Sequence, residues 1–144
     1  MSNDIVEEIN DVISVLKGGA EFYREGAEEV KNPELAKLFR EYAAKRDAAV
    51  IELSAEVAAH GGTPSEGSWA EKAHAWYGEA KSWFGDKEDT LIAELEEHED
   101  RTLEEIRDAL EDVPATHPAH ATLTRHLGIF QQTHDHMRDL KKAA

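Results

Sequence analysis

The 144-residue sequence contains no cysteine. This absence excludes a disulfide framework, thiolate catalysis and thiolate ligation of a metal. Long apolar runs are also missing, because no stretch approaches the roughly 20 apolar residues of a membrane-spanning helix. The first residues, MSNDIVEEINDV, lack the basic and apolar regions of a signal peptide. Together these absences predict a soluble, cytoplasmic protein.

Positive charge is scarce. Lys and Arg together number 16, against 31 Asp and Glu residues, and the formal net charge is −15. Nucleic acids and anionic membrane surfaces both attract clustered basic side chains. The one basic run is short and consists of Arg138, Lys141 and Lys142 near the C-terminal end. We therefore expect neither nucleic acid nor a membrane as partner.

Apolar residues recur every three or four positions over most of the chain, which is typical of amphipathic helices. The pattern predicts two hairpins of long helices, at about residues 4–60 and 90–142, and no strand. The connection between them, residues 61–89, includes a shorter amphipathic pattern at 68–84. A connection of this length is typical of the ferritin-like arrangement, in which it spans the bundle. The expected fold is an all-α, ferritin-like four-helix bundle forming one domain over residues 1–144.

The turns carry signals for helix ends. The Asn-Pro pair at 32–33 is typical of an N-cap followed by the first helical residue. Gly61 suits the left-handed conformation that ends a helix. The two later helix starts are marked by Asp86 or Asp89 and by Pro118.

Polar side chains interrupt the apolar stripes at one level of the predicted bundle. Glu99 lies in the stripe of the third long helix, Arg46 in that of the second, and Thr133 and His136 in that of the fourth. A buried carboxylate is costly alone, and a buried guanidinium needs an acceptor. The cheapest arrangement pairs Arg46 with Glu99, and His136 adds a hydrogen bond. The alternatives are binding of a metal or ligand, and exposure of these side chains at the bundle edge.

The stretch GGAEFYREGAEEVKNPELAKLF (residues 18–39) resembles the first hairpin of rubrerythrin-type ferritin-like proteins. The whole chain resembles a bacterial family of ferritin-like four-helix bundles with no assigned function. Such families are often linked with the stress response, and the resemblance implies the same expectation here.

The resemblance also implies where a di-iron site would lie. In ferritin-like di-iron proteins two helices each supply a Glu, and the other two each supply a Glu-x-x-His pair. The matching positions here are Leu16, Arg46, Ala49, Glu99, Thr133 and His136. Only Glu99 and His136 are residue types that bind iron there. The resemblance therefore implies a degenerate di-iron site, no enzymatic activity and no cofactor, with iron or another divalent ion held by Glu99 and His136 as the alternative.

Histidines elsewhere suggest a second kind of metal site. Near one edge of the bundle, the sequence offers a candidate set of three histidines and two glutamates: His98, His134, His136, Glu94 and Glu97. A His and a Glu four residues apart share one helix face, a spacing that metal sites use. The alternative is that these are ordinary neighbours on an acidic helix. The pair His117 and His120 is expected at the start of the last long helix, with incidental affinity for a metal ion.

All three tryptophans fall in the connection between the hairpins. Trp69, Trp76, Trp83 and Phe84 are predicted to lie close to one face of a short helix. They either cover the bundle or form a surface for a homodimer or for another protein partner, as exposed aromatic patches often do.

Overall fold

The computed structural model describes residues 2–65 and 87–143, and within these ranges it contains four long helices and no strand. The helices are α1 (Ser2–Glu29), α2 (Pro33–Ala59), α4 (Lys87–Asp112) and α5 (Pro118–Ala143). The prediction of an all-α four-helix bundle is confirmed. None of these described helices is apolar enough over its length to cross a membrane. The predicted aromatic surface of Trp69, Trp76, Trp83 and Phe84 lies outside the described residues.

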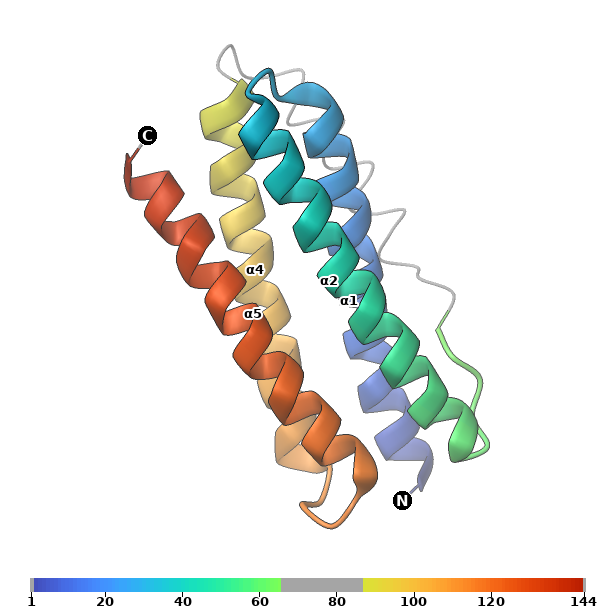
Figure 1. The fold of residues 1–144 in the computed structure, drawn as a ribbon. Helices are drawn as coiled ribbons and strands as arrows, with labels where there is room; N and C mark the ends of the chain where they lie inside the picture. Colours follow the sequence, from blue (N-terminus) through green and yellow to red (C-terminus); the bar gives the residue numbers. More distant parts are fainter. Residues whose placement is uncertain (1, 66–86, 144) are drawn as a thin grey trace.

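The helices pack as two antiparallel hairpins, α1 with α2 and α4 with α5, and α1 also packs on α4 (Figure 1). Glu88, in the first turn of α4, accepts hydrogen bonds from the backbone N–H groups of Lys31 and Asn32. The start of α4 therefore lies beside the turn between α1 and α2, whereas α2 ends at the opposite end of the bundle (Figure 1). The connection between α2 and α4 joins these two ends.

The helix ends follow local capping chemistry. The side-chain oxygen of Asn32 accepts hydrogen bonds from the N–H groups of Glu34 and Leu35, and Pro33 is the first residue of α2. Gly61 follows α2 with a φ of 79°, as predicted. Helix α4 begins at Lys87, which agrees with the first of the two starts that the sequence indicated, Asp86 or Asp89.

Buried apolar side chains form two separate clusters along the bundle. The cluster at the end where the chain begins is built mainly from these large side chains: Ile9, Ile13, Leu16, Leu53, Leu103, Ile106, Leu123 and Phe130. The cluster at the other end contains these: Phe22, Tyr23, Val30, Phe39, Tyr42, Leu91, Ile92, Leu95 and Met137. On α2, α4 and α5, the two clusters lie on either side of Arg46, Glu99 and Thr133, respectively. The core is thus divided by a polar layer.

Acidic side chains meet where α1 packs on α4. Burial raises the pKa of Glu8 to about 7, and a hydrogen bond with Asp112 and repulsion from Asp112, Asp11 and Glu105 act in the same direction. The native protein therefore keeps Glu8 protonated at pH values at which the unfolded chain has released this proton.

We expect the free energy of unfolding to fall as the pH rises, because of these acidic side chains between α1 and α4. Protonation of Glu8 stabilises the native state fully below the ordinary pKa of 4.5, and this contribution is lost as the pH rises to about 7. Urea unfolding between these pH values should give a falling free energy of unfolding, and Glu8→Gln should flatten the fall. The exposed neighbour Glu7 supplies the control, Glu7→Gln. Equal slopes in the two variants would contradict this assignment.

Candidate functional site

The polar layer (Tyr23, Arg46, Glu99, Thr102 and Thr133) draws side chains from all four described helices. Arg46 and Glu99 are its charged members, and their side chains are 0% and 1% exposed. Both charges are thus removed from water, which is costly unless each is paired and hydrogen-bonded. The geometry of the layer supplies those partners.

Glu99 accepts hydrogen bonds from three other helices. Its Oε1 atom accepts from Nη2 of Arg46 at 3.0 Å and from the hydroxyl of Tyr23 at 2.6 Å. Its Oε2 atom accepts from the hydroxyl of Thr133 at 2.7 Å. Both oxygens of the carboxylate are therefore engaged by donors of the protein itself. These contacts explain how a glutamate can occupy a position in an apolar stripe.

The Arg46 guanidinium is held on several sides. Its Nη1 donates to the hydroxyl of Thr102 at 3.0 Å, and that hydroxyl donates in turn to the backbone carbonyl of His98. The guanidinium carbon lies 5.5 Å from the ring centre of Tyr23 and 5.3 Å from that of Phe130. Aromatic faces attract a cation, and more strongly where water is excluded. The guanidinium thus lies close to two aromatic rings.

Gly19 makes room for this guanidinium. A Cβ atom built on Gly19 would lie 2.2 Å from Nη1 of Arg46 and 2.6 Å from its Cζ. Glycine inside a helix costs about 1 kcal/mol relative to alanine, yet here a larger residue would displace the buried cation. A glycine within a predicted helix is a sequence signal of such a close approach.

Tyr23 acts as a donor in the layer. Burial raises its pKa well above the ordinary value, and the nearby negative charge of Glu99 raises it further. The hydroxyl therefore keeps its proton and can donate it to Glu99. The sequence pattern alone does not indicate this polar role for Tyr23.

Contrary to the prediction, His136 is not part of the polar layer. Its side chain is exposed, and its Nδ1 atom lies 2.6 Å from the hydroxyl of Tyr42. The expected hydrogen bond of His136 to the Arg46–Glu99 pair is replaced by contacts from Tyr23 and Thr133. The helical pattern predicted that His136 lies on the face of α5 that points into the bundle, but it lies at the edge of that face.

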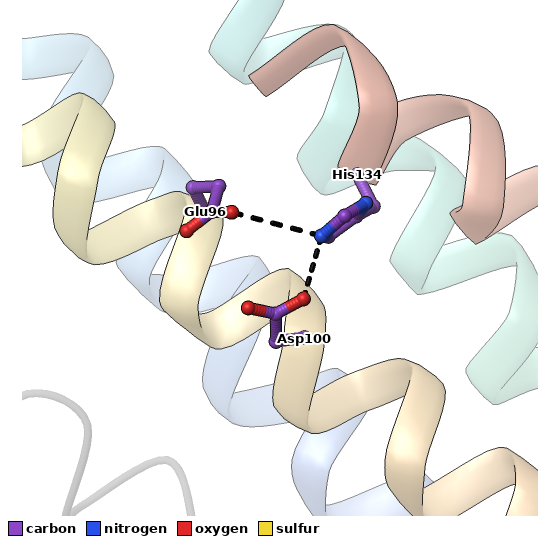
Figure 2. A group of neighbouring side chains, drawn as sticks. All are labelled: Glu96, Asp100 and His134. Atoms are coloured by element: carbon purple, nitrogen blue, oxygen red, sulfur yellow. Dashed lines mark ion pairs between the residues drawn. The ribbon is translucent and has the colours of Figure 1, made fainter. Parts of the chain in front are cut away.

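A second polar group, the edge triad (Glu96, Asp100 and His134), lies between α4 and α5. Figure 2 shows the His134 ring pointing from α5 toward two carboxylates on successive turns of α4. Its Nε2 atom is 2.6 Å from Oδ1 of Asp100 and 3.7 Å from Oε1 of Glu96. The potential ligand atoms all lie within 4.8 Å of one another. Among residues 2–65 and 87–143, this is the group whose spacing could hold a metal ion.

The ring of His134 is oriented from its other side. Its Nδ1 atom is 3.0 Å from Oδ1 of Asp135, and that oxygen accepts from Nε2 of Gln131 at 3.0 Å. Burial alone would lower the pKa of His134, but the carboxylates of Asp135, Asp100 and Glu96 together raise it. The acidic surroundings thus favour a positive charge at this position.

The other predicted metal-binding histidines lie apart from the edge triad. His98 is buried against Phe22, and within the described part of the chain neither of its ring nitrogens has a hydrogen-bond partner. Burial lowers the pKa of His98 to about 3, with the charge of Arg46 acting the same way. His117 accepts a hydrogen bond from the N–H of Ala119 and so caps α5. Of the predicted edge set, His134 alone belongs to the triad, with Glu96 and Asp100 in place of Glu94 and Glu97.

Comparison with known families finds a match over most of this chain. Residues 4–112 match a family described as Domain of unknown function (DUF2383). The chain belongs to this family. No curated protein matches it. The DUF2383 match includes Arg46, Glu99 and the α4 half of the edge triad and ends before α5, so Thr133 and His134 lie beyond it.

We expect Gly19→Ala to destabilise the protein by about 1–3 kcal/mol, as other substitutions that overfill a core do. The added methyl group must push the Arg46 guanidinium away from Glu99. Chemical unfolding measures the effect, and in an Arg46→Met background the cost of Gly19→Ala should shrink.

Gly128 provides the matched control. It is exposed in α5, and nothing lies within 4 Å of an added Cβ. Gly128→Ala should raise stability by up to about 1 kcal/mol through helix propensity. A gain of similar size for Gly19→Ala would show that the space beside Arg46 is not filled as described.

Proposed function

We propose that this DUF2383 protein is a non-catalytic four-helix bundle of ferritin-like descent, in which the Arg46–Glu99 pair takes the place of a di-iron centre. The observation that carries the proposal is the full burial of Arg46 with its guanidinium 3.0 Å from Glu99. A long connection between two helical hairpins, which joins opposite ends of the bundle, supports the ferritin-like part.

The residues of the polar layer do not fit a di-iron centre. Such a centre draws on several carboxylates and histidines from four helices. Here the layer offers one carboxylate, both of whose oxygens already accept hydrogen bonds. Leu16 and Ala49 are buried apolar residues at the positions where the resemblance expects ligands. A fixed cation beside Glu99 would also repel a metal ion.

The same layer can define how the four helices pack. Donors on α1, α2 and α5 converge on one carboxylate of α4. A helix that slid or turned would leave a buried charge or hydroxyl without its partner, which is costly. We therefore assign the layer a structural role. The function we propose for the molecule is binding through its surface, in the cytoplasm, and not chemistry in its core.

Substitutions at the ion pair test this structural role. Arg46→Met or Glu99→Gln leaves one buried charge without its partner, and each should lower the free energy of unfolding by about 3–5 kcal/mol. The double variant leaves no charge in the layer, so we expect it to be no less stable than either single variant. Urea unfolding measures all three proteins against the parent. Losses below about 1 kcal/mol for the single variants would be typical of an exposed pair and would contradict the proposal.

Metal analysis tests the loss of di-iron chemistry. Tag-free protein from iron-supplemented medium should contain no iron that depends on Glu99, and it should not accelerate the oxidation of Fe²⁺ by oxygen. Plasma mass spectrometry and a ferroxidase assay measure the two quantities, with Glu99→Gln as the comparison. One or more iron atoms per chain that disappear in Glu99→Gln would overturn the proposal.

A further inference from the structure

We propose that the edge triad (Glu96, Asp100 and His134) binds one divalent transition-metal ion of the Zn²⁺ type between α4 and α5. The three side chains offer one imidazole nitrogen and two carboxylate oxygens from two packed helices. Zn²⁺ sites with an open position combine three protein ligands of these kinds with a water molecule. The site is separate from the polar layer, which shares none of its residues.

Two of the three spacings between ligand atoms are close to those of a tetrahedral site, and the third, between the two carboxylates, is within 4.8 Å. Two ligands bound at about 2.0–2.1 Å to Zn²⁺ lie about 3.3 Å apart. Here Nε2 of His134 is 2.6 Å from the Asp100 oxygen and 3.7 Å from the Glu96 oxygen. Adjustments of about 0.7 and 0.4 Å would bring these pairs to the spacing that a bound ion requires. Side-chain rotations alone can supply movements of this size.

The ring of His134 is already held in the orientation that a metal ligand needs. An Nδ1–H group donates to Asp135, which leaves Nε2 facing Glu96 and Asp100. Histidines that bind metals usually donate their other ring N–H to a carboxylate or carbonyl, which fixes the tautomer and the ring orientation. Asp135 is itself oriented by Gln131 and lies 3.5 Å from Nη1 of Arg138. This second set of contacts lies outside the triad and supports a built site.

Glu96 is oriented in a similar way. Nζ of Lys141 lies 3.6 Å from its Oε2 atom, and its Oε1 atom is the one nearest to His134. The side chains of Glu96 and His134 are 13% and 12% exposed, whereas that of Asp100 is 59% exposed. Two ligands are therefore held between the helices, and the third lies toward solvent. An ion can enter from that side and keep a water ligand.

The donor set selects the class of ion. Mg²⁺ and Ca²⁺ prefer oxygen ligands only, whereas imidazole suits Zn²⁺ and its transition-metal neighbours. The carboxylates of Glu96 and Asp100 would neutralise the two charges of the ion. Lys141 contacts the ligand Glu96 and Arg138 contacts Asp135, and both cationic side chains are exposed to solvent by about half, so they can move aside.

The test is titration of the tag-free, full-length chain with ZnCl₂ by isothermal calorimetry. We expect one Zn²⁺ per chain, no heat with MgCl₂, and a visible absorption band when CoCl₂ replaces ZnCl₂. His134→Ala should weaken Zn²⁺ binding at least about 100-fold, and Asp135→Ala about 10–100-fold, as for other losses of an orienting carboxylate. Far-ultraviolet circular dichroism checks that each variant is folded.

His136→Ala is the matched control. It removes a histidine two positions away on the same helix that is exposed and contacts Tyr42. It should bind Zn²⁺ as the parent does, and Glu99→Gln should do so as well. Absence of Zn²⁺ binding by the parent would overturn the proposal and leave the triad as an ion pair of His134. Binding that survives His134→Ala would also overturn it, because the ion would then lie elsewhere, for example at His117 and His120.

Discussion

The ion pair between Arg46 and Glu99 is the constraint on which the rest of the bundle depends. Two charges in the middle of a hydrophobic core are tolerated only where each finds partners of the protein itself. The hydroxyls of Tyr23 and Thr133 complete the shell of Glu99, and Gly19 leaves space for the guanidinium. The polar layer then separates two apolar clusters, one toward each end of the molecule.

The polar layer and the edge triad use similar chemical groups in opposite settings. In the layer, every carboxylate oxygen of Glu99 is occupied by a donor and water is excluded. In the triad, Asp100 is exposed, and His134 and Glu96 are partly buried. A polar group that is buried from water stabilises the fold, whereas one that is exposed to water can exchange its partners for an ion. Burial, more than residue type, thus distinguishes the structural role of the polar layer from the metal-binding role proposed for the edge triad in this DUF2383 protein.

Much of the layer could be predicted because buried charge imposes strict demands. Arg46, Glu99 and Thr133 each fall in an apolar stripe, and their pairing follows from the cost of leaving either charge alone. Tyr23 and Thr102 were missed because an aromatic residue and a threonine are ordinary members of a helix face. His136 was assigned to the layer because it lies three residues after Thr133, but about 60° of rotation around the helix separates the two positions, and His136 lies at the edge of that face. The partners of His134 lie on α4, and periodicity within one helix does not predict contacts between helices.

The sequence by itself determined the four long helices, their caps at Asn32 and Gly61, and the need for a buried acceptor near Arg46. These are local properties, set by the spacing of apolar residues and by backbone chemistry within a few positions. Only the tertiary structure decided that Tyr23 reaches Glu99 and that His134 faces Glu96 and Asp100. Such contacts depend on the rotation and the relative height of separate helices, which are determined by packing over the whole length of the bundle.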